Sequence, residues 1–281
     1  MFTDRGRLYQ LFKYAVYAAL TVNIYLFFVD EWAASAYRFA DGVVLADIIE
    51  GFVATIDTAA WVILLLMFEL ETYILDDKNF TPRVTWTLHG FRAICYGFIV
   101  YSFYGYVIKV IFLSPMALLP NVNDLCSLVD GTWAYAFDYE QFVVLSASNC
   151  QTLSNANEFM LFPGMTAVVD QAGYRHTMGL AWVDVINSAV WLLVVLVLEI
   201  DVRLQEHNLL TGTALKLSNI SKYVLYSILV LALVYWTANG GFVDSWDSFL
   251  WLVAFIFIEL NVFDWRQESI EEQQAAIQPA L

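Results

Sequence analysis

Long apolar blocks alternate with short polar segments along the chain. The expected helices lie at about residues 8–29, 46–75, 86–113, 180–204, 219–238 and 246–265. Each block holds about 20 residues or more, the length at which an α-helix crosses a hydrocarbon layer about 30 Å thick. The apolar residues follow one another without the alternation of a β-barrel strand. The pattern therefore predicts an all-α integral membrane protein, with residues 1–281 forming a single domain of six transmembrane helices.

The second, fourth and sixth blocks share one spacing of Trp and polar residues. Each block has a Trp, a Glu eight residues after it and an Asp or Asn four residues before it. These residues are Trp61, Trp191 and Trp251, then Glu69, Glu199 and Glu259, then Asp57, Asn187 and Asp247. Two residues after each Glu comes Glu71, Asp201 or Asn261. A spacing repeated in three blocks favours an internal repeat.

The first, third and fifth blocks share a simpler feature, a basic residue four positions before a Tyr. The pairs are Lys13 and Tyr17, Arg92 and Tyr96, and Lys222 and Tyr226. Each pair of consecutive helices thus starts with a cation and ends with an anion near the same face. We therefore expect three tandem helical hairpins, with ion pairs of Lys13 with Glu69, Arg92 with Glu199, and Lys222 with Glu259, or a rotated version of the same set.

A polar segment at residues 117–175 separates the third and fourth helices. Its Pro, Gly and Asn residues and its length predict a small extracytoplasmic subdomain inserted at the tip of the second hairpin. The stretch "QFVVLSA" at 141–147 is expected to form a short strand. Cys126 and Cys150 lie in this segment, so we expect them to form a disulfide, whereas Cys95 is expected to be a buried thiol inside a helix.

Basic residues predict the orientation of the helices. All thirteen Lys and Arg residues except Arg38, Lys109 and Arg175 fall on the side of the two chain ends. The positive-inside rule then places both termini in the cytoplasm of a multi-pass protein of the inner (plasma) membrane, with residues 266–281 as a short cytoplasmic tail. An alternative is signal-peptidase cleavage after Ala34-Ser35-Ala36. The length of the first block and its place in the repeat favour a retained helix.

Composition and motifs exclude several classes of function. The net charge is −15, with 28 acidic and 13 basic residues, so a nucleic acid partner is not expected. The His residues at 89, 176 and 207 lie in different segments and cannot form a metal triad, and no nucleotide-binding glycine loop or hydrolase motif occurs. We expect no metal and no cofactor, and consider an enzyme less favoured than a non-enzyme.

Helix geometry places some of the repeated polar residues at membrane depth. From Asp57 to Glu69 a helix rises about 18 Å, too far for both ends to reach bulk water easily. The ion pairs can simply join neighbouring helices, with Asp57, Asn187 and Asp247 beside a headgroup-level Trp belt. Alternatively, the Glu residues form an inner charged tier that conducts cations or protons, and the Asp and Asn residues form an acidic outer tier. Residues added to that outer tier are Asp47, Glu50, Asp184 and Asp244.

Three functions follow in order of preference. The first is conduction or transport of a small cation or protons through the carboxylate tiers. The second is a membrane scaffold or sensor that acts through the 117–175 insertion on a membrane protein partner or on a second copy of the chain. The third is a membrane-embedded lipid-modifying enzyme. In each case we expect the protein to be embedded in the lipid bilayer, which is its first partner.

Overall fold

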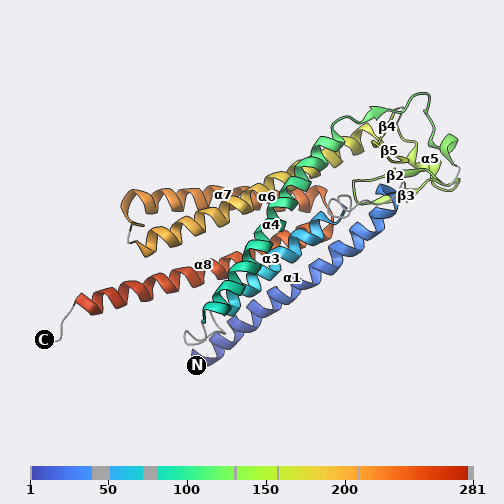
Figure 1. Cartoon of the computed structure of the whole chain (residues 1–281). Helices are drawn as coiled ribbons and strands as arrows, with labels where there is room; N and C mark the ends of the chain where they lie inside the picture. Colours follow the sequence, from blue (N-terminus) through green and yellow to red (C-terminus); the bar gives the residue numbers. More distant parts are fainter. Residues whose placement is uncertain are drawn as a thin grey trace.

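The computed structural model describes residues 2–39, 51–71, 81–129, 132–156, 158–207 and 209–277. Within these residues the chain forms a bundle of long helices with a small sheet at one end (Figure 1). The long helices are α1 (Phe2–Arg38), α3 (Val53–Glu69), α4 (Pro82–Leu113), α6 (Gln171–Glu206), α7 (Gly212–Asn239) and α8 (Phe242–Ile277). The start of α1 and the end of α8 lie away from the sheet in Figure 1.

Four helices of the described residues are long and apolar enough to cross a membrane: Arg7–Arg38, Pro82–Leu113, Gln171–Gln205 and Gly212–Asn239. The chain is therefore mostly helical, as a helical membrane protein is. Helices α1, α4, α6, α7 and α8 extend beyond the predicted blocks, and α8 continues through most of the expected 266–281 tail. Part of the predicted 46–75 helix falls outside the described residues, of which α3 covers Val53–Glu69.

The long helices form a closed ring. Each packs against the next along the chain, from α1 through α3, α4, α6 and α7 to α8, and α8 packs against α1. The main apolar core lies inside this ring and includes Leu20, Leu65, Val194, Leu229 and Phe257. All the long helices except α4 contribute to this core, and α4 packs through Cys95 and Ile99 in a smaller apolar cluster with Ala60 of α3.

The insertion contains a five-stranded sheet, so the all-α prediction is wrong for this part of the chain. Its strands are β1 (Ala117–Leu118), β2 (Ala134–Ala136), β3 (Phe142–Val144), β4 (Phe159–Leu161) and β5 (Ala167–Asp170), in the order β1-β4-β5-β2-β3. Neighbouring strands are antiparallel except β2 and β5, which are parallel. The short strand predicted in residues 141–147 is β3.

The insertion ends at Asp170 rather than at the predicted residue 175, because α6 begins at Gln171. The Asp170 side chain accepts a hydrogen bond from the Gly173 N–H at 2.6 Å and so caps the first turn of α6. At the start of α4, the Thr81 side chain accepts from the Val84 N–H, and Pro82 occupies the first turn. Local capping therefore sets where two of the long helices begin.

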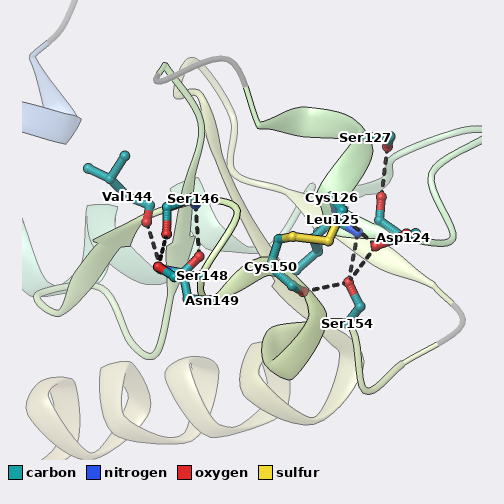
Figure 2. The surroundings of a disulfide bond; sticks show 10 residues. All are labelled: Asp124, Leu125, Cys126, Ser127, Val144, Ser146, Ser148, Asn149, Cys150 and Ser154. Carbon is teal, nitrogen blue, oxygen red and sulfur yellow. Dashed lines mark hydrogen bonds between the residues drawn. A yellow bond between two sulfur atoms is a disulfide. The ribbon is translucent and has the colours of Figure 1, made fainter.

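The predicted disulfide between Cys126 and Cys150 is present, and it joins a 3₁₀ turn, η3 (Leu125–Leu128), to α5 (Cys150–Leu153) (Figure 2). The Ser154 hydroxyl strengthens this junction by accepting from the Leu125 N–H at 2.8 Å and donating to the Cys150 carbonyl. Cys95 is a buried free thiol, as expected.

Candidate functional site

Two adjoining cavities lie where the bundle meets the insertion. The larger, which we call the vestibule, has a volume of about 460 Å³ and is lined by insertion residues 138–142 and by α1, α4, α6, α7 and α8. The smaller, the deep cavity, has a volume of about 80 Å³ and is lined by side chains from all six long helices. Four residues line both cavities: Glu140, Asp184, Trp236 and Asp244. The two cavities thus form one path from the insertion into the ring of helices.

The residues predicted to form the outer polar tier meet in the deep cavity. Asp57 from α3, Asn187 from α6 and Asp247 from α8 all line it. The Trp that follows each of them by one helical turn lines it too. Three helices therefore present the same polar and aromatic pair to one central space.

The expectation that these Trp residues lie in a headgroup-level belt is wrong. Trp191 and Trp251 are only 7% and 6% exposed. The Trp61 and Trp251 rings lie 6.2 Å apart, and the Phe255 ring lies 4.4 Å from that of Trp191. The rings pack on one another because their helices turn this face toward the centre of the ring.

The cavity shows two further members of the repeat that the sequence reasoning missed. Directly after the Asp or Asn comes a buried hydroxyl residue, Thr58, Ser188 or Ser248. Three residues before the Asp or Asn comes Ala54, Asp184 or Asp244, all of which line the deep cavity. The full spacing is [A/D]-x2-[D/N]-[S/T]-x2-W, and it is readable in the sequence at 54–61, 184–191 and 244–251.

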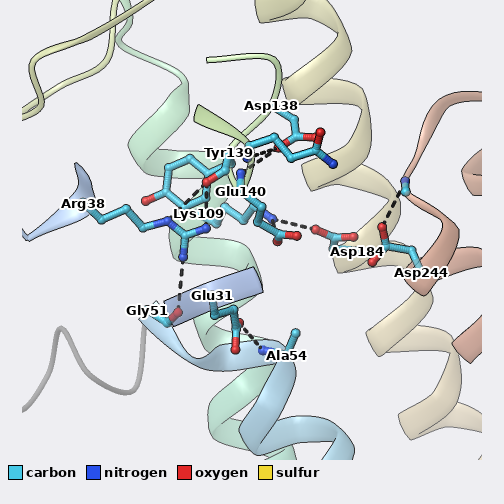
Figure 3. Close-up of polar contacts among 12 residues, drawn as sticks. Glu31, Arg38, Gly51, Ala54, Lys109, Asp138, Tyr139, Glu140, Asp184 and Asp244 are labelled. Carbon is cyan, nitrogen blue, oxygen red and sulfur yellow. Dashed lines mark hydrogen bonds and ion pairs between the residues drawn. The ribbon is translucent and has the colours of Figure 1, made fainter. Parts of the chain in front are cut away.

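Lys109 on α4 sits in the vestibule between two carboxylates (Figure 3). Its Nζ lies 2.9 Å from Asp184 Oδ2 and 3.5 Å from Glu140 Oε1. The same Nζ is 5.4 Å from the centre of the Tyr139 ring. A primary ammonium is therefore held here by two carboxylates and one aromatic ring.

Arg38 on α1 joins the insertion to the bundle from the other side of Tyr139. Its Nη2 donates to the Tyr139 carbonyl at 2.7 Å, and its Nη1 donates to the Gly51 carbonyl at 3.2 Å. The guanidinium lies 4.3 Å from the centre of the Tyr139 ring. These contacts fix residues 138–142 over the vestibule.

Glu31 and Asn23 on α1 also contact the helices that line the deep cavity. Neither residue belongs to the repeated sequence pattern. The buried Glu31 carboxylate accepts from the N–H groups of Ala54 and Thr55, at 2.8 and 3.1 Å, in the first turn of α3. The Asn23 amide donates to Asp247 Oδ1 at 2.7 Å. Both contacts position cavity-lining helices, and only the fold shows them.

Acidic residues far outnumber basic ones along the two cavities. The acidic lining residues are Asp30, Asp57, Asp138, Glu140, Asp184, Asp244 and Asp247, and Lys109 is the basic one among the described residues. In the insertion, burial and the neighbouring charge of Glu140 raise the pKa of Asp138. The expected additions Asp47 and Glu50 lie outside the described residues. The described lining can therefore attract a cation.

Several polar atoms in the cavity walls have no hydrogen-bond partner within the described chain. They are Asp57 Oδ1, Asn187 Oδ1, Ser248 Oγ and Thr177 Oγ1. Ser248 is 6% exposed and lines the deep cavity, and Thr177 is 1% exposed and lines the vestibule. Buried polar atoms are costly unless they gain a partner, so this wall is suited to a polar or charged ligand.

The inner tier of Glu residues is arranged differently from the outer tier. Lys13 Nζ lies 2.6 Å from Glu69 Oε1, and the Tyr17 hydroxyl donates to Glu69 Oε2 at 3.5 Å. Lys222 Nζ lies 3.2 Å from Glu259 Oε2, and the Tyr226 hydroxyl donates to Glu259 Oε1 at 3.1 Å. The Lys and Tyr of the repeated spacing therefore bind the same Glu in the first and third hairpins.

The second hairpin departs from the expected ion pair of Arg92 with Glu199. Arg92 Nη2 instead lies 2.5 Å from Glu71 Oε2, because α4 packs against α3, which ends near Glu71. Glu199 is exposed and binds Arg203 on its own helix at 2.9 Å. None of the three inner Glu residues lines either cavity. They make separate contacts rather than one shared polar tier.

Comparisons with protein-family models, with curated proteins and with solved structures give no match to this chain. Among the described residues, no three His, Cys, Asp or Glu side chains come close enough together to hold a metal ion. The cavity, whose described lining is acidic and aromatic, is thus the main guide to function.

Proposed function

We propose that the protein spans the plasma membrane six times as three helical hairpins, takes up a small cation from the extracytoplasmic side and moves it across the membrane. The observation that carries this proposal is the meeting of Asp57, Asn187 and Asp247 in one central cavity. Polar residues that face the interior of a membrane bundle are costly, and they commonly mark a solute path. The outer tier, rather than the inner Glu residues, is the proposed path.

The six-span topology is supported by the closed ring of helices. Besides the four helices that meet the length and hydropathy requirements, α3 packs between α1 and α4, and α8 packs between α7 and α1. Two non-spanning helices could not fill those places along the length of a lipid-embedded bundle. The disulfide in the insertion is typical of an oxidising compartment, which supports an extracytoplasmic insertion and cytoplasmic termini.

The internal repeat is supported by the same cavity. The three copies of the [A/D]-x2-[D/N]-[S/T]-x2-W spacing lie on α3, α6 and α8, the second helix of each hairpin. All three copies turn their Asp or Asn and their Trp to the deep cavity. Three equivalent hairpins around a central axis would give this result.

The cavity is open toward the insertion and closed toward the cytoplasm. Below the Trp residues the centre of the ring is filled by apolar side chains of the main core. A cation could not pass such a dry segment through a static pore. The proposed movement therefore requires a second arrangement of the helices that opens the cytoplasmic half.

Flux into proteoliposomes tests this function. Under an inside-negative potential, uptake of labelled sodium, rubidium and methylammonium is measured for the wild type and for Asp57→Asn and Asp247→Asn. We expect saturable uptake of at least one cation, lowered about tenfold or more in both variants, since a tenfold loss corresponds to only about 1.4 kcal/mol. Glu199→Gln is the matched control, because it removes an exposed carboxylate outside the cavities, and its uptake should equal that of the wild type. Absence of uptake of all three cations would contradict transport.

A second candidate function, a cation sensor, is favoured by the closed cytoplasmic half. The insertion supplies Glu140 to both cavities, so a bound cation would contact the insertion and the bundle together. The sensor would transmit cation binding to a membrane protein partner or to a second copy of the chain. Cation binding by the purified protein without flux in proteoliposomes would select the sensor over the transporter.

A further inference from the structure

The walls of the two cavities point to a chemical class of ligand, and this inference rests on the cation-binding cavity of the proposed function. We propose that the ligand is a small organic amine in its ammonium form, with an N–H-bearing ammonium in the deep cavity and the rest of the molecule in the vestibule.

The unpartnered atoms of the walls are those that an ammonium requires. Asp57 Oδ1 and Asn187 Oδ1 only accept hydrogen bonds, and the hydroxyls of Ser248 and Thr177 have lone pairs free to accept. An ammonium has up to three N–H donors and no acceptor. A ligand with acceptors but no donors, such as a carboxylate, would leave the Asp57 and Asn187 oxygens unsatisfied.

The aromatic lining favours an organic cation over a bare metal ion. The rings that line the deep cavity are Phe27, Trp61, Tyr106, Trp191, Trp236, Trp251 and Phe255. Ring faces attract a cation within about 6 Å of the ring centre, and ammonium ligands are recognised in this way. Among the described residues, no three carboxylates come close enough together to hold a metal ion. A small metal ion would need several oxygen ligands at once.

The Lys109 side chain is an example of an ammonium that is bound by carboxylates and an aromatic ring in the vestibule. Its ammonium is bound by Asp184 and Glu140 beside the Tyr139 ring. Farther along the path, Asp57, Asp244 and Asp247 form no ion pair with any Lys or Arg of the described chain. A second ammonium, supplied by the ligand, would give these carboxylates the partner that Lys109 gives to Asp184.

The two volumes fit an elongated amine. The deep cavity, at about 80 Å³, has room for a cationic head group. The vestibule, at about 460 Å³, lies in the range of small-molecule sites. Its exposed Asp30 carboxylate can bind a second amino group, so a diamine should bind better than a monoamine.

Calorimetric titration of the purified full-length protein in detergent tests the inference. The probes are 1,4-diaminobutane, methylammonium, tetramethylammonium, 1,4-butanediol, and the chlorides of sodium, potassium and magnesium. We expect 1,4-diaminobutane to bind and the neutral diol not to bind. Tetramethylammonium should bind about tenfold more weakly than methylammonium or worse, because it cannot donate hydrogen bonds to the wall.

Variants locate the binding site. Asp247→Asn should weaken 1,4-diaminobutane binding about tenfold, and Glu199→Gln should leave it unchanged. Ser248→Ala changes no charge and replaces Asp247→Asn as the test if that variant does not fold. It should weaken 1,4-diaminobutane binding severalfold. Three results would each overturn the inference: no amine binds, an inorganic cation binds as tightly as 1,4-diaminobutane, or Asp247→Asn and Ser248→Ala both bind the diamine as the wild type does.

This result and the flux result can fail independently. Amine binding without flux would sustain the ligand class and contradict transport. Sodium or rubidium flux without amine binding would sustain transport and overturn the ligand class.

Discussion

The Lys13 ammonium on α1 lies 2.6 Å from Glu69 Oε1 on α3, and both side chains are buried between the helices. Removing one partner leaves the other as a buried charge without this ion pair, which typically costs about 3–5 kcal/mol, whereas removing both costs much less. We therefore predict that Lys13→Met and Glu69→Gln each destabilise the protein by about 3–5 kcal/mol. The double variant should recover most of that loss.

Unfolding of the detergent-solubilised protein by increasing dodecyl sulfate measures this effect. The control pair is Glu199 with Arg203, which is exposed and lies on a single helix, so Glu199→Gln should change stability by less than about 1 kcal/mol. If the double variant is as unstable as the sum of the two single variants, the pair makes no coupled contribution.

The second prediction concerns Lys109 and chemical rescue. Lys109→Ala removes the ammonium from between Asp184 and Glu140 and should lower the thermal unfolding temperature. Added n-propylammonium has the three carbons and the ammonium that Lys109→Ala removes, so it can fill the vacated space and restore that temperature, whereas n-propanol should not. Melting curves at several concentrations of each additive measure this. Equal effects of the two additives would show that the carboxylates do not select an ammonium.

The disulfide is predicted to stabilise the insertion. A crosslink across 24 residues removes loop entropy from the unfolded state, which corresponds to about 3 kcal/mol. The double variant Cys126→Ser with Cys150→Ser should lose about this much stability, and reductant should have the same effect on the wild type. A Cys95→Ala variant is the control, because it should respond to reductant as the wild type does. Unchanged stability after reduction would contradict the prediction.

The fourth prediction is a loss of stability at high pH that depends on Tyr135 in β2. Burial and the neighbouring Asp170 carboxylate raise the pKa of Tyr135 to about 12. Because the protonated phenol is favoured in the folded state, its contribution is complete below about pH 10, the unfolded pKa, and is lost as the pH rises toward 12. Tyr135→Phe should remove this part of the pH dependence. The free energy of unfolding is measured for both proteins between pH 9 and 12. If it changes with pH in the same way in both, the prediction is wrong.

Local spacing predicted much of the polar architecture from the sequence. The repeated spacing correctly paired Lys13 with Glu69 and Lys222 with Glu259. The Tyr four residues after each Lys shares its helix face and binds the same Glu, which was not predicted. Spacing also grouped Asp57, Asn187 and Asp247. It could not show whether that face turns to lipid or to the centre, because both sides of a membrane helix are apolar.

Other features depend on which segments meet in space. Arg92 binds Glu71 because α4 packs against α3, and no pattern within either helix determines that choice. The strands of the insertion are two to four residues long, too short for a reliable alternation. Glu31 and Glu140 occur once each, outside any repeat. The Ser or Thr that follows each repeated Asp or Asn is visible in the sequence, but it was not predicted to be part of the repeat.

The central claim, an acidic cavity that opens to the extracytoplasmic side, is tested most directly by thiol modification at Ala33, an exposed residue of α1 that lines the vestibule. In a Cys95→Ala, Ala33→Cys protein, the rates of modification by a trimethylammonium and by a sulfonate methanethiosulfonate reagent are compared from each side of sealed vesicles. The account predicts reaction from the extracytoplasmic side only, with the cationic reagent faster by about tenfold or more. Asp57→Asn with Asp247→Asn should reduce that preference, and Glu199→Gln should not. Equal rates for the two reagents, or reaction from the cytoplasmic side, would contradict the claim.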